Sequence, residues 1–271
     1  MTPIYERPID ILRTLIRFDT TNPPGNEEAC IGYVRELLES AGISATLPAK
    51  TPTRPNLIAR LPGRGEAPPF LWQGHVDVVT TVNQNWSRDP FGAELIDGEL
   101  WGRGALDMKG GVAAMCAAAA RASAAGDLAS EIIVAAVADE EWASAGTRAL
   151  VEGGVRADAA IVTEPTRLAI MPAHRGFAWL ELVVHGRAAH GSRYDIGIDA
   201  IRMAALVLAE LDRHEREELV HRTHPLLGRA SLHASLVEGG IGMSTYPDRC
   251  TVRIERRTLP GESPVDATEE I

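Results

Sequence analysis

Six side chains that can bind a metal ion or carry a proton follow closely on apolar segments of the sequence. They are His75, Asp77, Asp107, Glu140, Glu141 and Glu164. One imidazole among several carboxylates, without cysteine, is a suitable ligand set for zinc, cobalt or manganese in an open site that admits water. Because a carboxylate has two oxygens, it can also bridge two ions held about 3.5–4 Å apart. These residue types therefore predict a two-metal hydrolytic centre.

The spacing suggests a separate task for each acid. Asp107 stands within WGRGALDMKGG (101–111), where glycines on both sides allow close backbone approach and favour Asp107 as the bridging ligand. Asp77 follows His75 by two residues and can accept the second ring N–H of that histidine. Glu140 and Glu141 project differently, so that one can bind metal while the other acts as general base.

Each of these residues taken alone also has an ordinary structural explanation. A histidine at a strand end is often simply hydrogen-bonded, and adjacent acids are favoured in the first turn of any helix. Glu164 precedes a proline and fits a plain turn. The occurrence of all six at successive strand ends favours the metal site over these explanations.

Apolar periodicity places the six residues in an α/β domain. Helices are expected at 6–18, 27–41, 111–125 and 147–152, and strands at 44–47, 56–61, 70–73, 131–138 and 159–163, with a loop over 80–98. Histidine or acids follow the last three strands. Open α/β sheets place their sites at the carboxyl ends of strands, so the pattern predicts one site at one sheet edge.

The pattern changes after Gly176, which predicts a boundary between domains 1–175 and 176–271. Alternating apolar residues predict antiparallel strands at 177–185, 231–237 and 250–258, with a helix at 198–213 between the first two. Ser263-Pro264 is a helix start, and the chain stops at residue 271. We therefore expect a C-terminally truncated chain, because a ferredoxin-like unit needs that helix and one further strand.

Composition excludes several classes of function. The chain has 27 basic and 37 acidic residues and a formal charge of −10, which argues against a nucleic-acid or anionic-membrane partner. Cys30, Cys116 and Cys250 are too few and too far apart for a disulfide framework or a thiolate metal site. The polar N-terminus lacks a signal-peptide pattern, and no apolar run is long enough to span a bilayer, so we expect a cytoplasmic protein.

Four segments together resemble the dinuclear zinc metallopeptidase family of acetylornithine deacetylase, succinyl-diaminopimelate desuccinylase, carboxypeptidase G and the aminoacylases. They read GHVDVV, WSRDPFGAELIDGELWGRGALDMKGG, ADEEWAS and VTEPT. The resemblance implies a zinc-exopeptidase-like catalytic domain, with a central mixed sheet and flanking helices, and a ferredoxin-like α+β lid domain that is incomplete here. It also implies a cis peptide bond between Asp107 and Met108.

The same resemblance assigns a role to each site residue. It implies that His75 and Glu164 hold one zinc, that Glu141 holds the other and that Asp107 bridges both. It makes Asp77 the residue that orients His75 and Glu140 the general base. Cobalt or manganese can substitute for zinc. The family's last metal histidine comes after the lid, and nothing in this sequence matches it.

The resemblance extends to the lid. His190, in AAHGS (188–192), matches the histidine that reaches the partner subunit's active site, which implies a homodimer formed through the lid. Arg257, in ERRTLPGE, matches an arginine that is either structural or binds a substrate carboxylate. Ser244 stands where the family usually has a substrate-binding asparagine.

The leading hypothesis is a zinc-dependent hydrolase that cleaves an amide bond in an N-acyl amino acid or short peptide. A water between the two metals, activated by Glu140, would attack the carbonyl. A second hypothesis is a truncated, catalytically incompetent module that retains one metal site. A third is an aminopeptidase-type dizinc enzyme, against which the motif around His190 argues.

Overall fold

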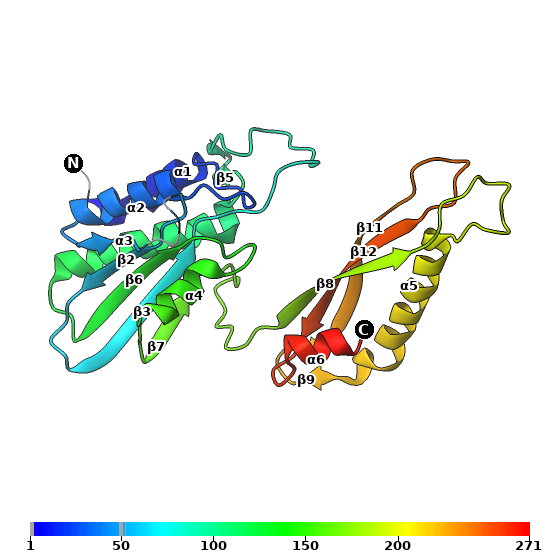
Figure 1. Cartoon of the computed structure of the whole chain (residues 1–271). Helices are drawn as coiled ribbons and strands as arrows, with labels where there is room; N and C mark the ends of the chain where they lie inside the picture. The colour runs from blue at the N-terminus through cyan, green and yellow to red at the C-terminus, as the bar shows by residue number, and fades with distance from the viewer. Residues whose placement is uncertain (1–2, 49–50, 52) are drawn as a thin grey trace. The chain divides into compact units, whose positions relative to one another are not determined.

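The computed structural model describes residues 3–48, 51 and 53–271. The chain forms two compact units, Met1–Leu168 and Ala169–Ile271 (Figure 1). The first is an α/β fold around a mixed sheet, and the second is built on a small antiparallel sheet, which confirms the predicted fold class. No helix in the described part of the chain has both the length and the apolar character needed to cross a membrane.

A five-stranded mixed sheet runs through the first unit in the order β1-β2-β6-β3-β7. The strands are β1 (Ala45–Thr46), β2 (Leu57–Leu61), β3 (Ala67–His75), β6 (Ser130–Val137) and β7 (Ala159–Val162). β6, β3 and β7 are parallel neighbours, whereas β2 pairs antiparallel with β6 and with β1. The carboxyl ends of β6, β3 and β7 therefore lie side by side at one edge of the sheet.

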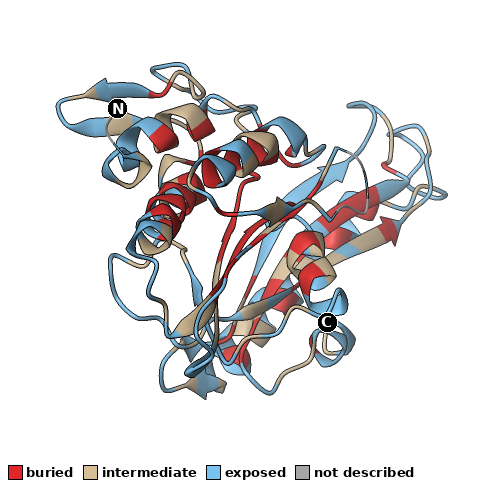
Figure 2. Ribbon diagram, turned by 90° about the vertical axis from the view of Figure 1, so that its left-hand side faces the viewer, coloured by how far each residue is buried: buried red, intermediate tan, exposed pale blue. Residues whose placement is uncertain are grey.

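Helices cover both faces of this sheet (Figure 1). A short 3-10 turn, η1 (Ile4–Glu6), leads into α1 (Pro8–Ile16), and α1 packs on one face with α2 (Glu28–Ser40) and α3 (Gly110–Ala125), while α4 (Ala145–Glu152) packs on the other. β6 is buried from Ile132 to Val137, and its residues alternate between the two layers of helices. Figure 2 shows the buried residues of the strands and helices in red. A continuous apolar run is what a strand covered on both faces requires.

A hairpin interrupts the segment for which the sequence predicted a loop. β4 (Glu94–Ile96) pairs antiparallel with β5 (Glu99–Trp101). The turn residues Asp97 and Gly98 both have positive φ, 51° and 85°. Asp-Gly at positive φ forms a two-residue turn that favours hairpins, so the expectation of a loop over 80–98 is wrong for its last residues.

α3 begins with glycines that let it approach the end of β7. A Cβ atom on Gly111 would lie 2.1 Å from the carbonyl oxygen of Thr163, the residue before Glu164. The turn η2 (Ala105–Lys109), which carries Asp107 in a non-helical conformation, directly precedes this helix. Absence of a side chain at position 111 therefore lets Asp107 and Glu164 come close to each other.

Gly111→Ala is expected to destabilise the first unit by about 1–3 kcal/mol, the usual cost of overpacking against backbone. Gly32→Ala in α2 is the matched control, because nothing lies within 4 Å of its Cβ position. It should stabilise the unit by about 0.5–1 kcal/mol through helix propensity. Urea unfolding followed by tryptophan fluorescence measures both, since four of the five tryptophans lie in this unit. Equal stability of the two variants would contradict the packing explanation.

The second unit is a three-stranded antiparallel sheet with a long helix on one face. β8 (Gly176–His185), β11 (Ser231–Gly239) and β12 (Arg249–Thr258) pair in the order β11-β12-β8. α5 (Ala200–Glu217) starts at Asp199, whose carboxylate accepts the amide of Arg202 at 3.0 Å. Its buried residues pack on the inward-facing side chains of the sheet, such as Val252 and Ile254.

Shorter elements complete this unit. A 3-10 turn, η3 (Leu219–His221), precedes a small hairpin of β9 (Thr223–His224) and β10 (Gly228–Arg229), which the sequence pattern did not predict. α6 (Pro264–Glu269) begins as predicted, because the hydroxyl of Ser263 accepts the amide of Asp266 at 3.0 Å.

A buried arginine on β12 ties the strand to the end of α6. Arg256 donates to Glu262 at 2.9 Å and to Glu270 at 2.7 Å. Arg222 pairs with the same two carboxylates. Burial by itself would raise the pKa of Glu262 and of Glu270. Hydrogen bonds from the Leu259 amide and the two arginines outweigh this effect and hold both pKa values below the usual one.

Acid is therefore expected to destabilise the second unit. Because the folded-state pKa values of Glu262 and Glu270 are lowered, their contribution is complete above the ordinary value of 4.5 and is lost as the pH falls through the folded values. Each charged hydrogen bond is worth about 1.5–3 kcal/mol. The urea midpoint of the second unit, measured through amide hydrogen exchange in β8 and β12, should fall in acid. The Glu262→Gln/Glu270→Gln variant should lose this pH dependence, and a wild-type midpoint that does not change in acid would contradict the explanation.

Candidate metal centre

Five side chains of types that can bind a metal ion meet at the edge formed by the carboxyl ends of β6, β3 and β7. His75 is the last residue of β3, Glu140 and Glu141 follow β6, and Glu164 follows β7. Asp107 comes from η2, directly before α3. In two groups all ligand atoms lie within 4.8 Å of one another: His75 with Asp107 and Glu141, and His75 with Glu140 and Glu164. The parallel strands thus bring together residues from distant parts of the sequence.

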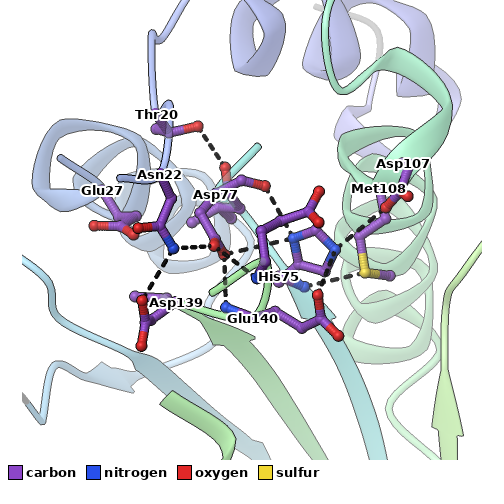
Figure 3. Close-up of polar contacts among 12 residues, drawn as sticks. Thr20, Asn22, Glu27, His75, Asp77, Asp107, Met108, Asp139 and Glu140 are labelled. Carbon is purple, nitrogen blue, oxygen red and sulfur yellow. Dashed lines mark hydrogen bonds and ion pairs between the residues drawn. The ribbon is translucent and has the colours of Figure 1, made fainter. Parts of the chain in front are cut away.

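The imidazole of His75 lies at the centre of this group (Figure 3). Its Nε2 atom is 3.3 Å from Asp107 Oδ1, 3.5 Å from Glu164 Oε1 and 3.7 Å from Glu140 Oε2. The histidine side chain is 1 % exposed, whereas the three carboxylate side chains are 34–55 % exposed. The centre therefore has a fixed, buried nitrogen and carboxylates that reach solvent.

The backbone of Asp77 fixes the other ring nitrogen. His75 Nδ1 lies 2.9 Å from the carbonyl oxygen of Asp77 and 3.5 Å from its carboxylate. With its proton on Nδ1 and donated to this carbonyl, the ring presents Nε2 to the cluster. The Asp77 carboxylate accepts instead the amides of Glu140 at 3.1 Å and Glu141 at 3.0 Å. Its side chain thus holds the loop that carries the two glutamates.

The carboxylates change the protonation of the histidine. Burial by itself would lower the pKa of His75. Hydrogen bonds with Asp107, Asp77 and Glu164 outweigh burial and raise the pKa to about 12. The metal-free cluster therefore holds a proton on the imidazole, because the surrounding negative charge demands a positive one.

The two glutamates titrate above their usual range. Burial raises the pKa of Glu140; the charge of His75 opposes this effect, and the charges of Glu164 and Asp77 add to it. Burial raises the pKa of Glu141 to about 7; the charge of His75 opposes this effect, and the charges of Asp107 and Glu140 add to it. Carboxylates with raised pKa values in a shared site are typical of residues that take up protons or cations.

The turn that presents Asp107 has special backbone geometry. Gly104 precedes it at φ 78°, and the Asp107–Met108 peptide bond is cis, which confirms the expectation from the resemblance. Met108 accepts the amide of His75 on its sulfur at 3.1 Å. The buried Lys109 donates to the carbonyl of Phe18 at 2.8 Å. These contacts attach η2 both to β3 and to the chain after α1.

The donor set fits divalent cations. One imidazole nitrogen and four carboxylates converge without a thiolate, and this is the ligand chemistry of zinc, cobalt or manganese. The two groups share His75 and otherwise use different acids, so the cluster has enough oxygen ligands for more than one ion. The raised pKa of His75 shows the same demand for positive charge.

Sequence reasoning missed the residues behind Asp77. The side-chain amide of Asn22 donates to both Asp77 and Asp139 (Figure 3). Arg54 pairs with Asp139 and with the buried Glu27. The segment TTNPPG (20–25) has the composition of a turn that ends a helix. The one sequence signal for this role is the position of Asn22, a polar residue between a threonine and two prolines.

The structure brings two of the lid candidates together. The turn at His190 adjoins the loop of Ser244, because the Gly191 amide donates to the carbonyl of Ser244 at 2.7 Å. The His190 ring is exposed and contacts the hydroxyl of Ser192 through Nδ1 at 2.9 Å. A histidine and a serine held in adjacent exposed loops form a polar surface on this unit.

Arg257 lies on β12, in a different environment. Its guanidinium lies 5.5 Å from the centre of the Phe177 ring, and its Nε atom is 3.2 Å from the carboxylate of Glu255. The side chain is 41 % exposed. Arg257 therefore presents a partly neutralised positive charge on the face of the sheet opposite α5.

Comparison with known proteins identifies the family. Residues 71–267 match the sequence profile of Peptidase family M20/M25/M40. The chain is 33 % identical over 263 residues to an acetylornithine deacetylase of Myxococcus xanthus, covering 93 % of this chain and 67 % of that protein. It is 40 % identical over 170 residues to a succinyl-diaminopimelate desuccinylase of Rhodospirillum centenum, covering 59 % of this chain and 43 % of that protein. The chain thus spans about two thirds of the length of the first relative, and its match covers less than half of the second.

Solved structures share the fold. An M20 family metallo-carboxypeptidase from Sulfolobus solfataricus superposes with a TM-score of 0.79 at 18 % identity, covering 97 % of this chain and 74 % of that one. A dinuclear metal-binding peptidase of the M20 family from Bacillus subtilis gives a TM-score of 0.64, also at 18 % identity, and covers 98 % of this chain and 68 % of that one.

Proposed function

The chain belongs to Peptidase family M20/M25/M40, and from that premise we propose that it is a dizinc hydrolase cleaving the amide bond of an N-acyl amino acid or short peptide. One observation carries the proposal. His75, Asp107, Glu140, Glu141 and Glu164 converge in two groups with all ligand atoms within 4.8 Å. The relatives named for deacylation and the carboxypeptidase named for peptide cleavage share amide hydrolysis, which such a centre supports.

Each ligand has a proposed place. His75 and Glu164 would hold one ion, Glu141 would hold the other, and Asp107 would contribute its carboxylate to both. Two divalent ions would supply Lewis-acid polarisation of the scissile carbonyl and a lowered pKa for water. The hydrogen bond from His75 Nδ1 to the Asp77 carbonyl fixes the ring, so that Nε2 would be free to bind an ion.

Glu140 carries the proton. Its carboxylate lies within 3.7 Å of His75 Nε2, yet its side chain is 42 % exposed and so can meet water and substrate. As the water oxygen bonds to the carbonyl carbon, Glu140 takes the water proton. It then passes that proton to the nitrogen of the leaving amine as the C–N bond breaks. The burial that raises the pKa of Glu140 makes it a better base for this transfer.

The lid residues complete the proposal. We assign His190 of a second subunit to the substrate carbonyl, where an imidazole N–H stabilises the developing oxyanion. Arg257 and Ser244 contact the substrate, and Arg257 binds a carboxylate group of that substrate. The homodimer that this arrangement needs forms through the lid.

Metal analysis combined with an amidase assay tests the proposal. The zinc-loaded protein should contain two ions per chain and hydrolyse at least one member of a panel of N-acetyl, N-succinyl and N-formyl amino acids and dipeptides. Chelation should abolish that turnover, and added zinc or cobalt should restore it. Fewer than one ion per chain and no hydrolysis of the panel would contradict the proposed function.

A further inference from the structure

Two buried carboxylates lie next to the loop that carries Glu140 and Glu141, which we call the glutamate loop. A single side-chain amide group lies between the two carboxylates. Asp77 and Asp139 are 0 % and 5 % exposed. The Nδ2 atom of Asn22 donates to Asp77 Oδ2 at 2.8 Å and to Asp139 Oδ1 at 3.0 Å (Figure 3). An uncharged group with two N–H bonds thus satisfies two acids without bringing in a further charge.

Both acids support the loop that carries Glu140 and Glu141. Asp77 accepts the amides of these two residues, and Asp139 accepts the amide of Ala145 at 3.3 Å, at the start of α4. Asp139 has φ 64°, so its backbone is held in a left-handed conformation that most residues avoid. The side chains of Asp77 and Asp139 therefore determine where the loop backbone lies.

Hydrogen bonds to the chain after β3 fix the position of the segment that contains Asn22. The hydroxyl of Thr20 donates to the carbonyl of Val76 at 2.6 Å, and the amide of Asn22 donates to the carbonyl of Val78 at 2.9 Å. The segment around Asn22 thus runs beside the chain that leaves β3, directly after His75. This links the histidine end of the centre to the glutamate loop.

A second connection holds Asp139 from the other side. Arg54 pairs with Asp139 at 2.9 Å and with the buried Glu27 at 2.7 Å. Asp77 has no arginine partner among the described residues. Its carboxylate lies 3.5 Å from His75 Nδ1 and accepts hydrogen bonds from Asn22 and from the two loop amides. Loss of Asn22 would leave Asp77 and Asp139 facing each other with no donor between them.

We propose that Asn22 is a positioning residue that sets the Glu140–Glu141 pair relative to His75 by bridging Asp77 and Asp139. The inference rests on the proposed function, in which Glu141 binds one ion and Glu140 moves the proton. His75 and Glu164 reach the centre from β3 and β7 and do not depend on the loop after β6. The role of Asn22 is therefore specific to one of the two ions.

Titration with Co²⁺ tests this inference without requiring turnover. The visible absorption of bound Co²⁺ reports each binding step, and Glu141→Gln identifies the step that depends on Glu141. Asn22→Asp is the informative variant, because it keeps the shape of the side chain and removes both N–H bonds. Asn22→Asp and Asn22→Ala should weaken the Glu141-dependent step about 10–100-fold and leave the other step unchanged.

Leu38→Ala is the control for general destabilisation, because Leu38 is buried in the first unit between α2 and the sheet. It should lower Tm at least as much as the Asn22 variants and leave both binding steps unchanged at 25 °C. In the active protein, Asn22→Asp should lower kcat more than it raises KM, since Glu140 is displaced from the reacting water.

Three results would overturn the inference. If both Asn22 variants bind Co²⁺ with wild-type affinities, Asn22 does not position the glutamates, and the proposed function is unaffected. Equal weakening of both steps, in proportion to the loss of Tm, would assign Asn22 a purely structural role. Absence of any Co²⁺ binding by the wild-type chain would refute the proposed function and this inference with it.

Discussion

Glu140→Gln is expected to reduce kcat by about 10²–10⁴-fold while the metal content remains that of the wild type. The amide keeps the size of the side chain and cannot accept the proton of the attacking water. Because Glu140 is proposed as the base and not as a ligand, the ions should remain bound. Metal analysis of the purified variant beside its kcat, measured on the same preparation, provides the test.

The adjacent glutamate supplies the matched control. Glu141→Gln should lose the ion that depends on Glu141, and its activity should recover partly at high metal concentration, whereas that of Glu140→Gln should not. Both residues donate their backbone amides to Asp77, so the two variants disturb the loop to a similar degree. Wild-type turnover by Glu140→Gln, or metal-dependent rescue of that variant, would refute the assignment of the base.

Asp107→Ala is expected to remove both ions and to reduce activity below detection. A bridging carboxylate contributes to both sites, so its loss weakens each of them, while loss of Glu164 or Glu141 should weaken chiefly one. Asp107 Oδ1 lies 3.3 Å from His75 Nε2, and the side chain is 55 % exposed. Its removal should therefore disturb little packing.

Thermal unfolding with and without metal separates ligand loss from misfolding. Metal that binds only the folded state stabilises it by about 2.7 kcal/mol at a concentration of 100 Kd, so wild-type Tm should rise when zinc is added. Asp107→Ala should unfold near the Tm of the metal-free wild type and show no such rise. Retention of two ions per chain by Asp107→Ala would exclude a bridging role.

The elements that carry the site were predictable because their signals are local. The apolar run before His75 and the apolar segment before Asp139 both form parallel strands, and the small-residue segment after Gly110 forms α3. Each signal depends only on neighbouring side chains and on the period of a strand or helix. The hairpin at Asp97-Gly98 carried an equally local signal, which the expectation of a loop overlooked.

The contacts of Asp77 differ from those that its position in the sequence predicted. Its position two residues after His75 predicted a side-chain contact with the ring. In the structure its carbonyl lies closer to Nδ1 than its carboxylate does, and the carboxylate holds the amides of Glu140 and Glu141. Strand geometry near residue 77 and the return of the chain after β6 determine this together, and neither is visible in the spacing.

Residue types and periodicity were sufficient to identify the donor set, the α/β fold and the change to an antiparallel unit. Folding added the partners of those donors. Asn22 meets Asp139 across 117 positions of sequence, and Gly111 is required by the carbonyl of Thr163. Buried polar groups need hydrogen-bond partners, and close backbone contacts need residues without bulky side chains. Which residues meet these needs depends on how the chain packs. Such partners follow from three-dimensional packing, whereas a metal-binding histidine or carboxylate is recognisable from its own chemistry.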